Sequence, residues 1–492
     1  MFASVALLLV VVLLLLLLGQ NRRPKNFPPG PRPIPIIGNL LELNLENPIA
    51  DLNRLAKHYG NVYSMFIGPR PAVIISGVQA LKEALVNKAA DFSGRPQNLM
   101  VNHVSQVKAD APGVILADYN NVWKEQRRFG LMTLRNFGLG KQLMEQSILD
   151  ETQRIMKILE QSVGKTMNPK QLFHSAASNI ICGVLFGMQF NYDDDVLKDF
   201  VNFFCDSSKM INGPWNMIYD TIPLVRNLPL PFNKVFQMFR SAREKRSEMM
   251  AKTKKTRVPG KPRHFIDCYL DEIDKRGNDG SSFSEDQLCT YLVDLHFAGT
   301  DTTANTVLTA FLYLMNYPEA QERCQQEIDE VLNGRDVSFE CRNQMPYVQA
   351  VLHEVQRLAN TVPLSVFHCT TKDTELMGYS IPRGTVVIPN LHSVLNEEGQ
   401  WKSPHGFHPE NFLNEKGEFV KPEAFTPFLS LPAGPRTCLG EGLARMELFL
   451  IVVSLLRRFK FIWPEDAGEP DYTPVFGVTQ TPKPYSIKLQ LR

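Results

Sequence analysis

Paired cysteines are missing from this sequence. None of its eight cysteines belongs to a Cys-x-x-Cys pair or a zinc-finger spacing, and nothing suggests a disulfide framework, so we expect a reducing compartment. Excess charge is missing too: the formal net charge is +2, which gives no global reason to expect a nucleic-acid partner. The chain also lacks internal repeats and any β-α-β rhythm.

Helical patterns dominate what is present. We expect a short helix over residues 52–59 and mainly helical structure over 121–317, with hairpin strands at 62–67 and 72–76, strands at 376–380 and 386–388, and a terminal strand at 485–492. Hydrophobic residues make up 44% of the chain, enough for a large core. The sequence therefore predicts a mainly α fold with small β-sheets.

An apolar run opens the chain, and basic residues follow it. Only one of the seventeen residues Phe2–Leu18 is polar, which is at the short end for a membrane-spanning helix. No Lys or Arg precedes the run, whereas three lie within residues 21–25, and such positive charge keeps its flank cytosolic. We expect a signal-anchor over 1–20, a basic and proline-rich hinge over 21–38, and a cytosolic catalytic domain over 39–492. A cleaved signal peptide is the alternative for the first segment.

Two further stretches have more than one interpretation. Arg243–Arg263 contains nine Lys or Arg residues; a nucleic-acid patch is conceivable, but a solvated helix end and loop is preferred, so no nucleic-acid partner is expected. Trp215–Phe232 is apolar and interrupted by proline. Contact with the membrane surface and burial in the core both stay open for it.

The strongest functional signal is the stretch Leu431–Gly440, which reads Leu-Pro-Ala-Gly-Pro-Arg-Thr-Cys-Leu-Gly. Glycines let a backbone approach a flat cofactor closely. Cys438 lies just ahead of a helical pattern, and the partial positive charge of a helix N-terminus favours a thiolate. The pattern Gly-x-Arg-x-Cys-x-Gly therefore indicates an axial thiolate ligand of haem iron. A buried structural cysteine is the alternative.

A long helix is predicted over residues 284–317, with a capping box at its start. Its middle, Ala298–Thr303, contains poor helix formers, and broken local rules inside a helix mark a candidate functional site. The small residues 298–299 would leave room for a ligand, while Asp301 and Thr302 could relay protons. A bent helix with Thr hydroxyls bonded to its own backbone is the alternative.

Two pairs of side chains share helix faces. Glu354 and Arg357 are three residues apart and can form an ion pair, for which an ordinary surface pair is the alternative. Trp123 and Arg127 are four apart, and an indole N–H beside a guanidinium suits a carboxylate such as a haem propionate. A packed Trp with a solvated Arg is the alternative for the second pair.

The order of these motifs along the chain resembles the cytochrome P450 superfamily, and the resemblance covers the whole chain. Phe92–Pro96, Trp123–Phe129 and Phe297–Thr303 look like the vertebrate family 2 branch, which oxidises drugs and fatty acids. The resemblance implies the cytochrome P450 fold with an N-terminal transmembrane helix in the endoplasmic reticulum membrane.

The resemblance also implies roles for the matching residues. Cys438 would be the axial thiolate of haem b, Asp301 and Thr302 would deliver protons to bound dioxygen, and four side chains would hold the propionates: Trp123, Arg127, His368 and Arg436. Glu354 and Arg357 would be a structural pair behind the haem. The substrate would be lined by Phe297, Ala298, Val362, Leu364, Phe476, Gly477 and Val478. Basic side chains would receive an acidic reductase: Lys124, Arg128 and Arg135.

Three positions depart from the family pattern. The usual Phe seven residues before the cysteine is Leu431, as if Leu429–Leu431 had been inserted; an outward bulge and a gene-model error both stay open, and the second is preferred. Asn411 replaces the Arg of the Pro-Glu-Arg-Phe pattern, which changes a polar network. Phe367 replaces the Pro before His368, which reshapes a substrate-facing turn.

We therefore expect a haem-thiolate monooxygenase that inserts one oxygen atom from O2 into an apolar small molecule. Its electrons would come from NADPH through NADPH-cytochrome P450 reductase, with cytochrome b5 as a further candidate partner. The alternatives are a haem-thiolate isomerase or dehydratase acting on peroxides, and a non-catalytic binder of haem or an apolar ligand. The sequence leaves the substrate open among xenobiotics, fatty acids and steroids, and it does not fix the regioselectivity or the oligomeric state.

Overall fold

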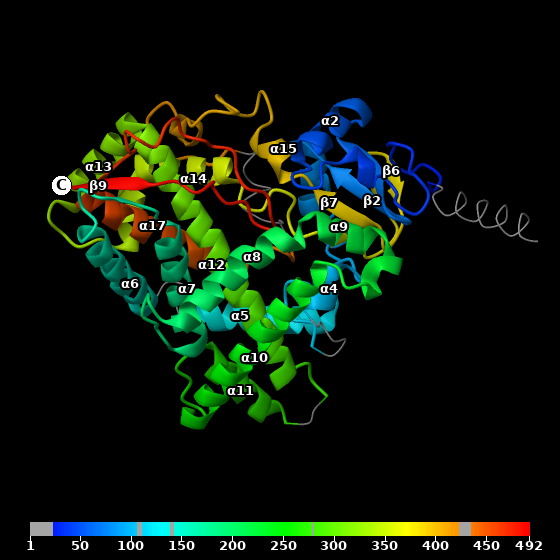
Figure 1. Cartoon of the computed structure of the whole chain (residues 1–492), viewed down its shortest axis with the longest axis horizontal. Helices are drawn as coiled ribbons and strands as arrows, with labels where there is room; N and C mark the ends of the chain where they lie inside the picture. The colour runs from blue at the N-terminus through cyan, green and yellow to red at the C-terminus, as the bar shows by residue number, and fades with distance from the viewer. Residues whose placement is uncertain (1–22, 106–110, 138–141, 278–279, 423–433) are drawn as a thin grey trace, which may run out of the picture.

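Helices make up most of the molecule (Figure 1). The computed structural model describes residues 23–105, 111–137, 142–277, 280–422 and 434–492. The helices before the middle of the chain are α2 (Ile49–Tyr59), α3 (Val78–Lys82), α4 (Met100–Val104), α5 (Asn121–Phe137), α6 (Gln142–Glu160), α7 (Lys170–Phe186), α8 (Asp195–Ile211), α9 (Pro214–Thr221) and α10 (Phe232–Thr256). The later ones are α11 (Phe265–Arg276), α12 (Glu285–Asn316), α13 (Pro318–Leu332), α14 (Pro346–Ala359), α15 (Leu391–Leu395) and α17 (Glu441–Arg458).

The strands form three small sheets. The first has the order β1-β2-β7-β4, and its strands are β1 (Val62–Ile67), β2 (Arg70–Ile75), β7 (Val386–Pro389) and β4 (His368–Cys369). The second has the order β3-β9-β8, with β3 (Thr166–Met167), β9 (Ile487–Leu491) and β8 (Phe459–Ile462). The third pairs β5 (Thr374–Leu376) with β6 (Tyr379–Ile381). The mainly α fold with small sheets is therefore confirmed.

One predicted strand is wrong. Residues 376–380 are not a single strand, because the chain reverses at Met377 and Gly378. Both residues have positive φ, +49° and +82°, as the tight turn of a two-residue hairpin requires. The predicted hairpin at 62–67 and 72–76 and the terminal strand correspond to β1–β2 and β9.

The start of α12 confirms half of the predicted capping box. The Ser284 side chain accepts the N–H of Gln287 at 3.1 Å, as an N-cap serine does. The Gln287 side chain does not reach back to Ser284. It exchanges two hydrogen bonds with the backbone of Gly113 instead, at 3.0 and 3.1 Å, and so ties the loop before α5 to the long helix.

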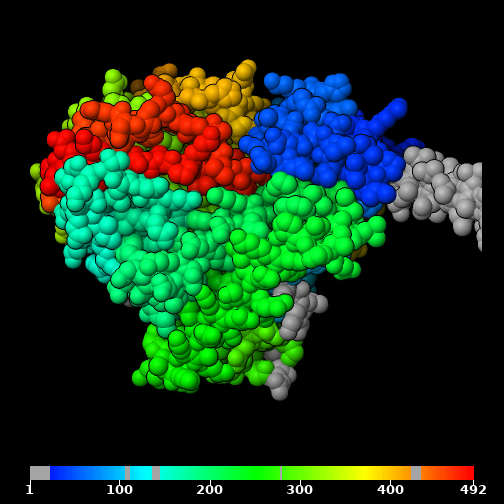
Figure 2. Space-filling model, viewed as in Figure 1, coloured from blue at the N-terminus to red at the C-terminus, as the bar shows by residue number. Residues whose placement is uncertain are grey.

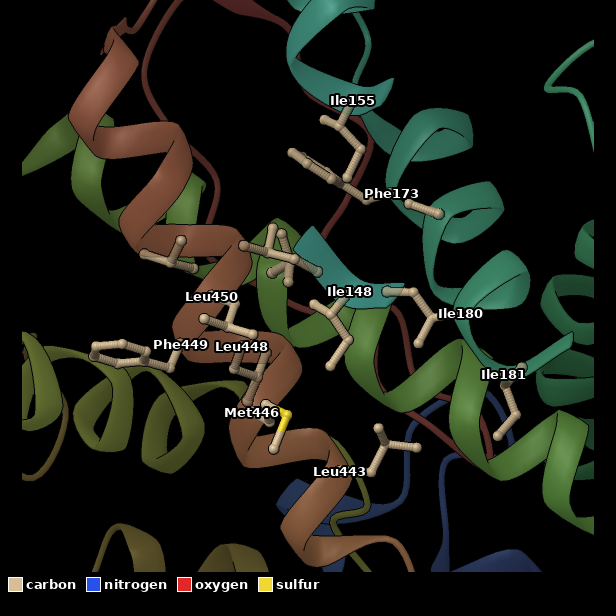
Figure 3. Close-up of a cluster of buried hydrophobic side chains, with 14 of the residues drawn as sticks. Ile148, Ile155, Phe173, Ile180, Ile181, Leu443, Met446, Leu448, Phe449 and Leu450 are labelled. Carbon is tan, nitrogen blue, oxygen red and sulfur yellow. The ribbon is translucent and has the colours of Figure 1, made fainter. Parts of the chain in front are cut away.

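The main core lies where α12 packs along α7 and where α17 packs against α6. Figure 3 shows Leu443 and Met446 of α17 pointing toward Ile148 of α6, with Ile180 of α7 close by. Gly299 belongs to this packing, because a Cβ at that position would lie 3.0 Å from Ile181 of α7. The expectation that Gly299 leaves room for a ligand is therefore wrong: it lets two helices approach each other.

The N-terminal part of the chain, drawn in blue, lies beside α9 and the C-terminal segment (Figure 2). Part of the predicted hinge is hydrogen-bonded to β1: Ser64 donates its hydroxyl to the Pro28 carbonyl at 2.7 Å and its N–H to the Pro29 carbonyl at 2.7 Å. The predicted anchor over 1–20 lies outside the described residues. Among the helices that the structure describes, none combines the length and the apolar character needed to cross a bilayer.

The two ambiguous stretches have different outcomes. In Arg243–Arg263, several basic side chains pair with acidic residues of neighbouring segments, for example Arg257 with Asp271 at 2.6 Å. This supports the solvated helix end and loop. Trp215–Phe232 is divided, because Phe232 is fully buried whereas Leu224 is 85% exposed.

Candidate active site

The cysteine loop ends at the N-terminus of α17. Cys438 is exposed and lies two residues before Gly440, the N-cap of the helix. Gly434 has a φ of +92°, and a Cβ there would lie 2.5 Å from the Ala89 Cβ, so this end of the loop requires glycine. A Cβ at Gly440 would meet nothing within 4 Å, so Gly440 borders open space.

The electrostatic balance at the thiol differs from the expectation. Desolvation by the surrounding protein atoms raises the pKa of Cys438 above its ordinary value, although the residue as a whole is exposed. The backbone N–H of Gly440 and the Arg127 guanidinium act in the opposite direction but do not outweigh it. In the protein alone the helix N-terminus therefore does not suffice to favour the thiolate, and a bound cation would have to complete the stabilisation.

A cluster of cationic side chains lies beside this loop. The Arg436 guanidinium lies 4.1 Å from the Trp123 ring centroid, and that of Arg127 lies 5.5 Å from it. Arg127 also donates a hydrogen bond to the Thr437 carbonyl of the cysteine loop. Three of the four predicted propionate ligands are thus brought together around one indole ring.

Two buried polar atoms of this cluster have no hydrogen-bond partner among the described residues. They are Nη1 of Arg436 and Nε2 of His368, although the other nitrogens of both side chains bind backbone carbonyls. Burial and the neighbouring Arg95 lower the pKa of Arg436 to about 8 and that of His368 well below its usual range. The unpaired Nη1 of Arg436 is a buried donor, and it calls for an anion. The unpaired Nε2 of His368 is the acceptor nitrogen of a neutral ring, because Nδ1 donates to the Phe92 carbonyl.

These residues fit a haem group. A thiol on an open glycine-bordered loop would supply the axial ligand. Arg436, through its unpaired Nη1, and Arg127 would supply the counter-charge for two propionates. The indole N–H of Trp123 was expected to bind a propionate. It donates instead to the Val114 carbonyl at 3.0 Å.

Sequence reasoning missed Arg95 as a member of this cluster. It is buried, and burial together with the nearby Arg127 lowers the pKa of its guanidinium to about 9. It donates to the carbonyls of Val366 and Phe367 just before His368, at 2.9 Å each. Its place in the motif Phe92–Pro96 was the available signal.

Glu354 and Arg357 form a buried pair, so the alternative of a surface pair is wrong. Both side chains are fully buried, and two parallel hydrogen bonds of 2.7 and 2.8 Å join them. Arg357 also donates to four backbone carbonyls between Leu395 and Gly406. Asn411 donates to both oxygens of Glu354, at 3.2 and 3.3 Å, so it is the third side chain of this polar network.

The middle of α12 separates the two predicted proton-relay residues. Asp301 is buried and binds His174 at 3.1 Å, and it accepts a hydrogen bond from Thr479. Thr302 is half-buried, and its hydroxyl donates to the Ala298 carbonyl at 2.7 Å. Consecutive helical residues point about 100° apart, which explains why the two side chains face different surroundings. The back-bonded threonine that was the alternative is therefore present.

Comparison with known proteins decides the family. The family model for cytochrome P450 matches residues 28–489. Over 95% of its length the chain is 40% identical to cytochrome P450 2D15 of Canis lupus familiaris and 38% identical to cytochrome P450 2F2 of Mus musculus, covering 93% and 94% of those proteins. Cytochrome P450 2D14 of Bos taurus is 40% identical over 98% of the chain and 97% of its own length.

The chain belongs to the cytochrome P450 family. It is therefore a haem-thiolate monooxygenase, which works on an apolar substrate with a redox partner. The isomerase and the non-catalytic binder are not favoured by these relatives.

The structure of this P450 brings together some of the predicted substrate-lining residues. Leu364 and Phe476 line one cavity, together with Phe367, residues of β1 and β2, and residues of α9. Phe297, Ala298, Val362, Gly477 and Val478 do not line that cavity. Ala298 is exposed and Phe297 half-buried on α12, so they belong to a different surface.

A second groove of this P450 runs beside the cysteine loop along α5. Four basic side chains line it together with aromatic and apolar ones, and the lining residues are Tyr119, Trp123, Lys124, Arg127, Arg128, Leu131, Met132, Arg135 and Pro435. The three basic residues predicted to receive a reductase are all among them. The Leu429–Leu431 insertion lies outside the described residues.

Proposed function

We propose that this P450 oxygenates a xenobiotic, a fatty acid or a steroid at the endoplasmic reticulum membrane, with electrons from NADPH delivered by NADPH-cytochrome P450 reductase. The observation that carries the proposal is the buried cationic cluster, with its unpaired Arg436 Nη1, next to the exposed thiol of Cys438. Haem bound there supplies the activation of dioxygen, with electron density contributed by the thiolate.

The polar side chains around the loop have separate tasks in this proposal. Arg127 and Arg436 would neutralise the propionates, and the Trp123 ring supports both guanidiniums. His368 would join them by donating from Nε2 once that nitrogen is protonated, because its Nδ1–H is used on the Phe92 carbonyl. The propionate would in turn remove the cost of leaving Nη1 of Arg436 buried without a partner. Glu354 and Arg357 keep the segment that leads to the cysteine loop attached to α14.

Proton delivery is assigned to Thr302, with Asp301 behind it. The Thr302 hydroxyl uses its proton on the Ala298 carbonyl, so its oxygen can still accept a hydrogen bond and pass a proton onward. Asp301 is hydrogen-bonded to His174, which holds the carboxylate in place next to Thr302.

Substrate entry and binding are assigned to apolar surfaces. The cavity between Leu364, Phe367 and Phe476 supports a pocket for an apolar molecule. Exposed Trp215 lies on α9, which lines the same cavity, and exposed Leu224 and Leu228 follow that helix. These three side chains support contact of this end with lipid. The apolar run at 1–20 would anchor the same end, with the catalytic domain in the cytosol.

Electron transfer is assigned to the groove along α5. Lys124, Arg128 and Arg135 are exposed there, and their charge complements an acidic partner. NADPH-cytochrome P450 reductase is the proposed donor, and cytochrome b5 could use the same surface.

Reconstitution of the purified protein in vesicles with the reductase tests the proposal. We expect NADPH consumption, O2 consumption and hydroxylated product to rise together with drugs, fatty acids or steroids that perturb the haem spectrum. Rearrangement of a peroxide without reductase would indicate an isomerase. Ligand binding with no NADPH-dependent product from any of the three substrate classes would contradict the proposal.

A further inference from the structure

Three potential metal ligands meet inside the molecule, away from the cysteine loop. They are His174 of α7, Cys205 of α8 and Asp301 of α12, and one ligand atom from each lies within 4.8 Å of the other two. His174 is fully buried and Asp301 is 2% exposed, whereas Cys205 is half-buried. The consecutive helices α7 and α8 and the distant helix α12 thus contribute an imidazole, a thiol and a carboxylate to one small volume.

The hydrogen bonds of His174 fix which of its nitrogens faces the cluster. Its Nδ1 lies 2.9 Å from the Lys170 carbonyl, and a carbonyl only accepts, so Nδ1 carries a proton. Its Nε2 lies 3.1 Å from Oδ1 of Asp301. In a neutral imidazole the lone pair of Nε2 would face the carboxylate oxygen and the two would repel each other. A proton or a metal cation must therefore lie between the two atoms.

We propose that His174, Cys205 and Asp301 form a binding site for one Zn²⁺ ion, which replaces the proton between His174 and Asp301.

The donor set and its spacing suit zinc. Tetrahedral Zn²⁺ with bonds of about 2.0–2.3 Å keeps its ligand atoms about 3.3–3.8 Å apart. The His174–Asp301 pair is already at 3.1 Å, and the widest separation in the cluster, 4.8 Å at most, needs to close by only about 1 Å. The Nδ1–H bond from His174 to a carbonyl is the usual support of a zinc-bound histidine.

Charge favours the same ion. A thiolate, a carboxylate and a neutral imidazole offset the two charges of Zn²⁺, so the buried complex is neutral overall. The second oxygen of Asp301 stays occupied by Thr479, which is held by Ser208 at 2.8 Å. A hard cation such as Mg²⁺ is disfavoured, because it prefers all-oxygen ligands.

Protons compete with the ion. Burial lowers the pKa of His174, but hydrogen bonds to Asp301 and Cys205 outweigh it and raise the pKa to about 10. Zinc must displace the proton that lies between His174 and Asp301. Zinc affinity should therefore rise with pH.

Equilibrium dialysis of the full-length, haem-loaded protein against chelator-buffered Zn²⁺ tests the proposal, because haem occupies Cys438 and removes that thiol from competition. Bound zinc is measured by mass spectrometry, and the carbon-monoxide spectrum verifies that each variant is folded. We expect one high-affinity zinc in the wild type. Cys205→Ser and His174→Gln should each weaken it at least about tenfold.

The matched control is Cys268→Ser, because Cys268 is also half-buried but lies outside the cluster. It should bind zinc like the wild type. X-ray absorption at the zinc edge should detect one sulfur ligand in the wild type and none in Cys205→Ser. The proposal is overturned if zinc affinity is equal in wild type and Cys205→Ser, or if the wild-type zinc shows no sulfur ligand.

Discussion

Removal of Arg357 should destabilise this P450 more than almost any other single change of charge. Arg357→Met keeps the volume and the apolar stem but deletes six hydrogen bonds, two to Glu354 and four to backbone carbonyls. It also leaves the buried Glu354 charge with only Asn411 and the His408 N–H as donors. Breaking a buried pair in this way costs about 3–5 kcal/mol.

The measurement is the free energy of unfolding from urea titrations, followed by far-UV circular dichroism and by loss of the haem absorption band. The matched control is Arg458→Met, because Arg458 pairs with Glu160 at 2.9 Å but both side chains are at least 40% exposed. That exposed pair should contribute less than about 1 kcal/mol.

A double variant separates the unpaired charge from the lost carbonyl contacts. Glu354→Gln combined with Arg357→Met removes the stranded carboxylate, so the double variant should cost less than the sum of the single ones, by about 0.5–3 kcal/mol. The reasoning is refuted if Arg357→Met is no more destabilising than Arg458→Met. Strict additivity of the two changes would show that the ion pair itself contributes nothing.

Five other predictions address the haem ligand, the proton path, the core, the membrane segment and the loop before the cysteine. Cys438→His should abolish both the thiolate-type spectrum of the reduced, carbon-monoxide-bound protein and oxygenation; an unchanged spectrum would contradict the ligand assignment. Thr302→Ala should retain haem and substrate but divert NADPH electrons to hydrogen peroxide, whereas an unchanged ratio of product to NADPH would leave only the back-bonding role. Burial raises the pKa of Glu447 from 4.5 to about 8, so between these pH values the folded protein keeps a proton that the unfolded chain loses. The free energy of unfolding should therefore fall by up to about 1.4 kcal/mol per pH unit in this range. Glu447→Gln should flatten this pH profile, and an equal slope in variant and wild type would contradict the prediction. Deleting residues 1–19 should release much of the protein from membranes with its haem spectrum intact, and full membrane retention would contradict this. Deleting Leu429–Leu431 should leave haem occupancy unchanged or higher, and loss of haem would contradict that.

Local rules predicted much of the fold. The Ser284 cap and the Pro318 stop set the ends of a helix that runs over Glu285–Asn316, and the Glu354–Arg357 spacing indicated a pair that does form. These features depend on neighbours within four residues, for which spacing is sufficient information. The expected strand over 376–380 failed because Met377 takes a positive φ, which a side chain of that type rarely adopts.

Contacts between distant segments could not be predicted. Asp301 was expected to act with its neighbour Thr302, but its partner His174 is 127 residues away, and only the packing of α7 on α12 brings the two together. The Trp123 indole was expected to serve a ligand, yet a carbonyl nine residues earlier accepts its N–H. In both cases the residue type was informative, while the choice among several possible partners depended on tertiary structure.

The parallel pairing of β2 with β7 has a consequence for synthesis. Ile75 pairs with Pro389, roughly 310 residues later, so the β1–β2 hairpin emerges from the ribosome long before its neighbour exists. At about 5–20 residues per second, the apolar edge of β2 stays unpaired for about 15–60 s. An unpaired edge of that kind is a template for pairing with other chains. Any nascent chain that stops before residue 386 keeps this edge open permanently, which should make premature termination products of this protein prone to aggregation or to capture by chaperones.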